Sequence, residues 1–446
     1  MKMKILRSLS IAGFLLFFLC LSSPFAHAVN VRKSILPNGL ILLHSENHSI
    51  PIVTVSLIVK VGQIHEPKGK SGIAHLTAEL LTEGTKNLSS RDISEGTDFI
   101  GASLDASAGN DYTTVSLSVL KKDINKGFVI LSDILLHPSF PEEELVRKKD
   151  LIKGSLKHRE EEPSFLAERA FREGIFGEHP YSRLIEGSFD TIEKIKREDI
   201  IKYYSEYYLP NNSILSISGD LTSEECNDLV KQYFGEWEKG VSPCVAVERT
   251  PIQKEKKVIK IDKDLTQANI ILGNLGISRD NPDYYAVSVM NYILGGGGFS
   301  SRLMQSIREN SGLAYDVHSY FLAYKESGAF QAGVQTKNES AGTAIHEILK
   351  QIKRMRDEKV SDQELFDAKA YLTGSFPRRL DTNRKIADFI ASIEFFGLGL
   401  DYDKKYSDYI NTVTQDDVLR VARKYLEPEN YVIVIVADQK KAMLKY

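Results

Sequence analysis

The chain has 446 residues, of which 42% are hydrophobic, 9% are aromatic and 26% are charged. These proportions are typical of a folded globular protein, so they exclude disorder as the main state, and the length predicts two to four domains. The 57 lysines and arginines are balanced by 60 aspartates and glutamates, which gives a net charge of -3. Because nucleic-acid binding needs a basic surface, we expect no nucleic-acid partner.

The first 28 residues are typical of a secretory signal peptide. Basic residues precede the apolar run 11–21, and the small-residue site Ala26-His27-Ala28 follows it. We expect cleavage after Ala28 and export to the periplasm or the cell exterior. The alternative is an uncleaved anchor, although the run is short for a membrane span. No later stretch approaches 18 consecutive apolar residues, so we expect no membrane span in the mature chain.

A repeat divides the mature chain into two halves. A helical segment, a proline-marked turn and an apolar strand occur at 197–220 and again at 414–438. A repeat this widely spaced indicates a domain duplication. We predict an N-terminal domain at 29–240, a linker at 241–257 that contains two prolines and a charge run, and a C-terminal domain at 258–446.

Both halves begin with strands and continue through long amphipathic helices, such as 142–159 in the first half and 341–359 in the second. This mixture favours the α+β class, with two homologous halves that each contain a mainly antiparallel sheet with helices packed on one face. Only Cys226 and Cys244 remain in the mature chain, and the sequence leaves open whether they pair.

His44 and His48 are the first candidate metal ligands along the chain. Their surroundings are typical of a strand, in which residues four apart lie about 13 Å from each other. Ligand bonds to zinc are near 2 Å, so we do not expect these two histidines to share an ion.

Segment 69–85 predicts a helix that places His75 and Glu79 on one face, one turn apart. With its flanks Gly72-Ile73-Ala74 and Glu83-Gly84-Thr85, it resembles the inverted zinc motif H-x-x-E-H of the pitrilysin and mitochondrial processing peptidase superfamily. The resemblance covers nearly the whole mature chain. It implies two α/β sandwich halves that enclose a chamber for peptides.

The chain departs from this motif where the motif carries chemistry. The resemblance places Ala78 where the family has its general base, and Glu79 where it has its second histidine ligand. The third ligand position falls on Gly154-Ser155, unless Glu160 or Glu161 replaces it. A catalytic zinc needs three protein ligands, and a general base contributes about 10² to 10⁴ in rate. We expect no catalytic residue and no zinc in this chain, with His75 and Glu79 as a degenerate metal site.

The second half keeps the residues that the family uses to hold its substrate. The glycine run 295–298 lacks the Gly-Lys-Ser/Thr of a phosphate loop. With the segment that follows, it resembles the family's second-half segment, which implies that Arg308 and Tyr315, seven residues apart, reach the substrate. Both side chains can donate hydrogen bonds to a peptide carbonyl and to the oxyanion that develops on it.

The strand 101–107 resembles the family's substrate-pairing edge strand, which implies that Asp105 and Ala106 lie beside a bound peptide. The alternative is an ordinary edge strand.

Together these features predict an exported, non-catalytic, substrate-binding subunit of a two-chain zinc metallopeptidase. A homologous partner with an intact H-x-x-E-H motif would supply the zinc, and Arg308 and Tyr315 of this chain would bind the peptide. One alternative is a non-enzymatic peptide-binding or scaffold protein. Another is an independent metallopeptidase with an atypical site at His75 and Glu79.

Overall fold

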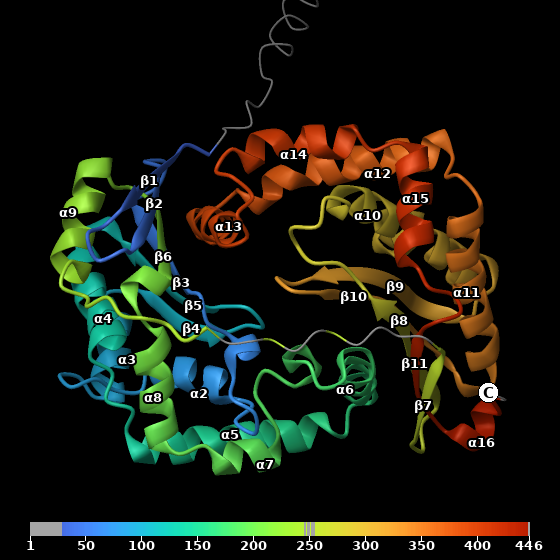
Figure 1. Cartoon of the computed structure of the whole chain (residues 1–446), viewed down its shortest axis with the longest axis horizontal. Helices are drawn as coiled ribbons and strands as arrows, with labels where there is room; N and C mark the ends of the chain where they lie inside the picture. The colour runs from blue at the N-terminus through green and yellow to red at the C-terminus, as the bar shows by residue number, and fades with distance from the viewer. Residues whose placement is uncertain (1–28, 245–246, 248–249, 251–254, 445–446) are drawn as a thin grey trace, which may run out of the picture.

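The computed structural model describes residues 29–244, 247, 250 and 255–444. The predicted signal peptide and the central part of the predicted linker lie outside the described residues. Two β-sheets stand at opposite ends of the molecule, and helices surround them and connect them (Figure 1). Within the described ranges, none of the helices combines the length and the hydropathy needed to cross a membrane.

The first sheet has six strands in the order β1-β2-β6-β3-β5-β4, and β4 is one of its edges. The strands are β1 (Val31–Ile35), β2 (Ile41–Glu46), β3 (Ile52–Val59), β4 (Ser103–Ala108), β5 (Thr113–Leu120) and β6 (Ser213–Gly219). The second sheet has five strands in the order β7-β11-β8-β10-β9. They are β7 (Lys257–Asp262), β8 (Gln267–Leu275), β9 (Ala314–Ala323), β10 (Gly328–Lys337) and β11 (Val432–Ala437).

The two sheets share one topology. β6 lies parallel to β2 and antiparallel to β3, and β11 lies in the same way between β7 and β8. A helix precedes each of these strands, α8 (Arg197–Tyr207) before β6 and α15 (Gln415–Tyr425) before β11. The predicted duplication and the α+β class are therefore confirmed.

The remaining helices follow the same plan in both halves. The first half contains α2 (Ile73–Leu80), α3 (Ser90–Phe99), α4 (Ile124–Leu136), α5 (Glu142–Arg159), α6 (Pro163–Phe176), α7 (Phe189–Lys194) and α9 (Ser223–Phe234). The second contains α10 (Tyr284–Asn291), α11 (Ala341–Asp357), α12 (Asp362–Ser375), α13 (Asn383–Phe395), α14 (Tyr402–Asn411) and α16 (Gln439–Ala442). Two π-helical segments, η5 (Tyr292–Gly296) and η7 (Met304–Asn310), lie on either side of the short helix η6 (Gly298–Ser300).

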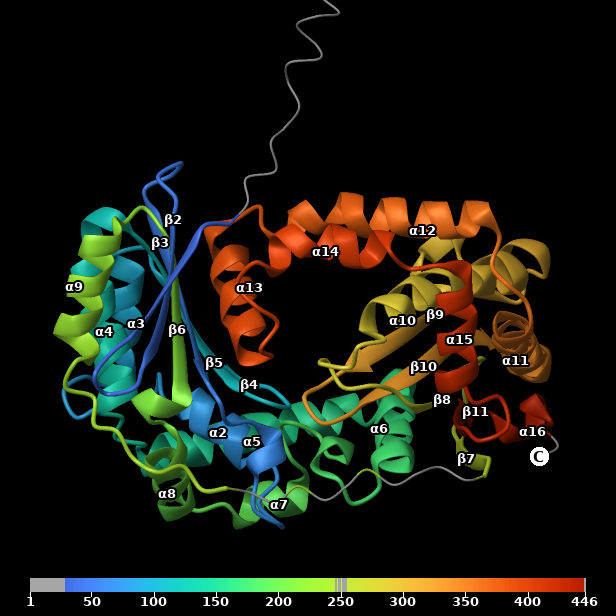
Figure 2. The ribbon, with the colours of Figure 1, turned by 45° about the horizontal axis from the view of Figure 1, so that its top comes forward.

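One helix from each half packs on the sheet of the other half. α6 lies against β8 and β11, where Phe171 and Ile175 join Val432 and Val434 in one buried cluster. Its approach to β11 is close, because a Cβ added at Gly174 would lie 2.8 Å from a methyl carbon of Val432. In return, α13 lies against β3 and β6 of the first sheet (Figure 2). The sequence predicted helices on one face of each sheet, and these crossing helices add cover on the other.

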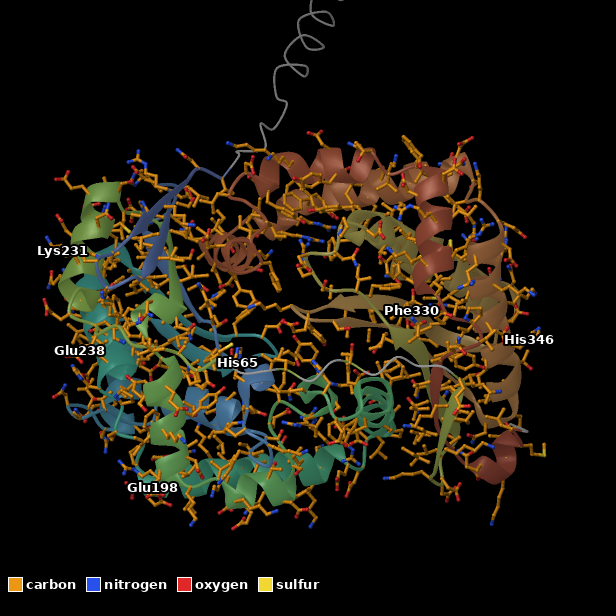
Figure 3. The ribbon with its side chains drawn as sticks, in the orientation of Figure 1. His65, Glu198, Lys231, Glu238, Phe330 and His346 are labelled. Carbon is orange, nitrogen blue, oxygen red and sulfur yellow. The ribbon has the colours of Figure 1, made fainter. Side chains whose placement is uncertain are left out.

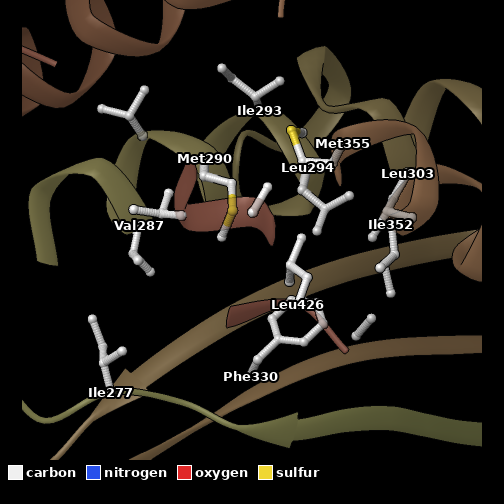
Figure 4. Close-up of a cluster of buried hydrophobic side chains, with 14 of the residues drawn as sticks. Ile277, Val287, Met290, Ile293, Leu294, Leu303, Phe330, Ile352, Met355 and Leu426 are labelled. Atoms are coloured by element: carbon white, nitrogen blue, oxygen red, sulfur yellow. The ribbon is translucent and has the colours of Figure 1, made fainter. Parts of the chain in front are cut away.

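Side chains from both halves project into the space between the two sheets (Figure 3). By contrast, the labelled residues Glu198, Lys231 and Glu238 lie on the outer rim of the first half. The core of the second half lies on the outer side of its sheet, where Val287, Met290 and Leu294 pack above Phe330 (Figure 4). This core packs the π-helical segments, and hence the segment that carries Arg308, against the sheet.

Candidate functional site

The N-terminus of α2, the helix that carries the degenerate motif, is fixed by contacts with two other segments. Gly72 precedes α2 with φ of 97°, which glycine adopts without strain. A Cβ at Gly72 would lie 2.5 Å from the carbonyl oxygen of Glu186, so the loop around Glu186 packs directly on the helix start. The Glu66 carboxylate accepts hydrogen bonds from the main-chain N–H groups of Gly72 and Ala74, at 2.9 and 3.1 Å. These contacts set the rotation of α2.

Glu79 is paired with a lysine. Its Oε2 lies 2.7 Å from Nζ of Lys148 on α5, and the same Nζ lies 2.8 Å from Oε1 of Glu83. The Lys148 side chain is only 15% exposed. His75, one turn before Glu79, is partly buried, and burial lowers the pKa of its imidazole. An ammonium group and a neutral imidazole therefore lie where the motif would place a metal and its ligands.

The residues present do not fit a catalytic zinc ion. Ala78 is fully buried and offers no base. Gly154 and Ser155 are exposed on α5 and carry neither carboxylate nor imidazole, and Glu160 is paired with Arg169 at 2.9 Å. The described ranges hold no group of three histidine, cysteine, aspartate or glutamate residues that could bind a metal.

Two adjoining cavities connect the motif with the second half. The first, of 350 Å³, is lined by His75, the end of β4 at Ser107 and Ala108, and the arginines Arg159, Arg169 and Arg172. The second, of 500 Å³, shares Arg159, Phe165 and Glu168 with the first and reaches His318 and Gln331 on the second sheet. The hollow between the halves thus extends from α2 to the second sheet.

The structure brings Arg308 and Tyr315 together. The Arg308 guanidinium carbon lies 4.6 Å from the ring centroid of Tyr315 and 4.7 Å from that of Phe299, so the cation lies against two aromatic rings. Tyr315 is 82% exposed, and its hydroxyl can meet a ligand. Arg302, which is 6% exposed, anchors the same segment through two hydrogen bonds to Glu364, at 2.6 and 2.9 Å. Sequence reasoning missed Phe299, although it directly follows the glycine run.

On β4, Asp105 and Ala106 point to opposite faces. Asp105 is exposed, whereas Ala106 is 6% exposed and belongs to the core of the first half. Asp105 can meet a peptide through its side chain, but Ala106 can do so only through its main chain. Whether either residue contacts a peptide stays a prediction.

The two cysteines of the mature chain do not form a disulfide, and the histidines His44 and His48 do not form a shared metal site. Cys226 is buried, Cys244 is exposed and both are free thiols, so they do not pair with each other. His44 is buried and lies 3.3 Å from the Ser223 hydroxyl, whereas exposed His48 lies between Glu46 and Asp220. The two histidines therefore have separate environments.

Comparisons with known proteins identify the family of this chain. Residues 42–188 match the family model described as "Insulinase (Peptidase family M16)", and residues 194–372 match "Peptidase M16 inactive domain". An "Uncharacterized zinc protease" of Rickettsia bellii is 32% identical over 77% of this chain and 82% of its own length. A "Non-peptidase homolog YmxG" of Helicobacter pylori is 26% identical over 90% of this chain and 92% of its own length.

A solved structure shows the same architecture. The crystal structure of a peptidase M16 inactive domain from Pseudomonas fluorescens superposes with a TM-score of 0.86 at 27% identity, covering 92% of this chain and 98% of that one. The chain therefore belongs to peptidase family M16, and the resemblance to the pitrilysin superfamily is confirmed. The domain bounds 29–240 and 258–446 stay a prediction, since the two family models meet near residue 190.

Proposed function

We propose that this chain is the exported, non-catalytic, substrate-binding subunit of a two-chain M16 zinc peptidase. The observation that carries the proposal is the contrast between its two halves. In the first half, a lysine holds the only carboxylate of the degenerate motif. In the second half, Arg308 and Tyr315 lie in contact on an anchored segment, with Arg308 half-buried and Tyr315 82% exposed.

The first half supports a role without metal chemistry. The ammonium of Lys148 lies within 2.8 Å of two carboxylates. A divalent cation at Glu79 would have to displace this ammonium or be repelled by it. With Ala78 at the base position, no side chain there can activate a water molecule for attack on a peptide bond.

The second half supports a role in peptide binding. The guanidinium of Arg308 and the hydroxyl of Tyr315 are hydrogen-bond donors that suit the main-chain carbonyls of an extended peptide. The two aromatic rings reduce the freedom of Arg308 before a ligand arrives, which lowers the entropy cost of binding. A homologous partner with intact H-x-x-E-H would supply zinc and base, and the segment 1–28 would direct export.

Affinity purification of the tagged mature chain from its own cells, followed by mass spectrometry, tests this proposal. We expect one co-purifying polypeptide near one-to-one, and its sequence should contain an intact H-x-x-E-H. Recovery of the chain alone would contradict the partnership. Recovery with unrelated membrane components would favour the scaffold alternative.

A further inference from the structure

An arginine from the second half reaches the edge strand of the first sheet. Arg384 is the second residue of α13, the helix that crosses to the first half (Figure 2). Its Nη1 donates to the Ser116 hydroxyl on β5 at 3.1 Å, and its Nη2 donates to the Ser103 hydroxyl on β4 at 3.5 Å. Two serines therefore hold a guanidinium on the inner face of the β4–β5 hairpin.

Asp105 lies on the same face of that hairpin. Successive side chains of a strand alternate between faces, and on β4 the residues Ser103, Asp105 and Ser107 are the exposed set. Asp105 is the cross-strand neighbour of Ser116, the serine that accepts a hydrogen bond from Arg384. A carboxylate and a guanidinium thus lie close together beside an edge strand.

Among the residues that the structure describes, neither Arg384 nor Asp105 forms an ion pair within 4.0 Å. The charged neighbours of Arg384 on α13 do not change this, since Lys385 pairs with Asp381 and Asp388 lies beyond ion-pair distance of Arg384. The far end of β4 opens into the 350 Å³ cavity at Ser107 and Ala108. β4 therefore ends at a cavity and has beside it two charges of opposite sign, those of Asp105 and Arg384, that form no ion pair among the described residues.

We propose that Arg384 and Asp105 select peptides by the spacing of their charges. The inference rests on the proposed function, because it needs a bound peptide, and on the expectation from the sequence that this peptide adds to β4. An acidic side chain beside Ser103 would bind Arg384, and a basic side chain two residues away would bind Asp105. Side chains two apart share one face of an extended strand, and directly opposed pairs stabilise strand pairing.

The order of the two charges in the preferred peptide also shows in which direction the peptide runs along β4. If the peptide runs antiparallel to β4, the basic residue precedes the acidic one, giving basic-x-acidic. If it runs parallel, the order is acidic-x-basic. A peptide with opposite charges at adjacent positions places them on opposite faces of the strand. Such a peptide can therefore pair with Arg384 or with Asp105, but not with both at once.

Fluorescence polarisation with labelled, threonine-rich peptides and the full mature chain tests the proposal. The panel contains Lys-x-Glu, Glu-x-Lys, adjacent Lys-Glu and Lys-x-Gln versions. We expect one of the two spaced orders to bind about fivefold to tenfold more tightly than the adjacent and glutamine versions. Equal binding of the spaced and adjacent versions, or no binding of any peptide, would overturn the inference.

Charge reversal provides the decisive variant. Asp105→Lys combined with Arg384→Glu should exchange the affinities of the two spaced orders. Lys385→Ala, which removes a cation from the next position on α13, should leave the ranking unchanged. If Arg384 and Asp105 instead pair with each other in solution, the reversed residues will also pair with each other. The ranking of the peptide affinities will then stay as it is in the wild type, and the inference falls. If the double variant does not fold, Arg384→Gln and Asp105→Asn should each reduce the preference separately.

This test can fail independently of the proposed function. A chain that co-purifies with an H-x-x-E-H partner but shows no spacing preference would refute only the role of Arg384 and Asp105. A chain that shows the preference but has no partner would refute the partnership and keep the peptide site.

Discussion

At the scale of single residues, Lys148 occupies the place beside Glu79 that a metal ion would need. Its ammonium lies between Glu79 and Glu83 and links α5 to the helix of the degenerate motif. Because a lysine supplies the positive charge here, we expect this part of the fold not to depend on a bound ion.

Lys148→Ala should therefore destabilise the protein, whereas removal of metal should not. The substitution leaves two partly buried carboxylates near each other, with a cost of about 2 kcal/mol in the free energy of unfolding. Urea denaturation at pH 7 measures this, and EDTA should leave the curve unchanged. Lys153→Ala on the same helix is the control, because its partner Glu193 is 67% exposed and an exposed pair contributes little to stability. A large loss of stability with EDTA would contradict this account.

The sequence identified the missing base at Ala78 and the carboxylate at Glu79, because both belong to one local motif. It did not identify Lys148 as the partner of Glu79, or Arg384 as a neighbour of the strand that carries Asp105. Lys148 contacts Glu79 across 69 positions in the chain, and Arg384 contacts Ser103 across 281. Local spacing carries no information about such contacts, because they depend on how the elements pack.

At the scale of elements, the segment that carries Arg308 is held by an ion pair between buried Arg302 and half-buried Glu364. Arg302 donates two hydrogen bonds to Glu364 on α12. Burial acts to raise the pKa of Glu364, but the hydrogen bonds from Arg302 and from the main chain of Ser361 outweigh it and lower the pKa to about 2. The folded protein therefore binds this proton more weakly than the unfolded chain does.

The sign of the pH dependence follows from this shift. The Glu364 contribution to stability should be complete above about pH 4.5 and should disappear as the pH falls toward 2. Glu364→Gln should cost about 2 kcal/mol at pH 7, and the difference from the wild type should shrink below about pH 4.5. Urea titrations across this range measure it, with exposed Glu358→Gln as the control. A difference independent of pH would show that the charge of Glu364 is not involved.

Several elements were predicted closely, and others were not. α5 has the predicted bounds, whereas α11 ends at Asp357, two residues before the predicted end. The segment after the glycine run forms a π-helix over Met304–Asn310, a winding that the sequence did not indicate. An amphipathic pattern shows that a helix buries one face but not which sheet covers it. The sequence therefore could not show that α6 and α13 cross to the opposite halves.

At the scale of the whole molecule, the crossing helices join the two halves into one unit. Each sheet has part of its inner face covered by the other half. Neither half can separate without exposing apolar residues such as Phe171 and Ile390, which are fully buried. The duplication was evident from the sequence, but this reciprocal packing was not.

We therefore predict a single unfolding transition for both halves. The one tryptophan, Trp237, is buried in the first half, so its fluorescence reports on that half, whereas far-ultraviolet circular dichroism reports on both. The two signals should change together with denaturant. Phe171→Ala, at the contact of α6 with the second sheet, should cost about 3 kcal/mol or more and shift both signals equally. Separate transitions would show that the halves are independent.

The most direct test of the central claim is peptide hydrolysis with the purified chains apart and combined. With zinc present, this chain alone should release no product, and adding it to its H-x-x-E-H partner should raise hydrolysis about 100-fold or more over the partner alone. Arg308→Ala should reduce the combined rate about tenfold or more, while Arg354→Ala, an exposed arginine on α11, should not. Zinc-dependent hydrolysis by this chain alone, lost on His75→Ala, would contradict the account and establish an independent peptidase.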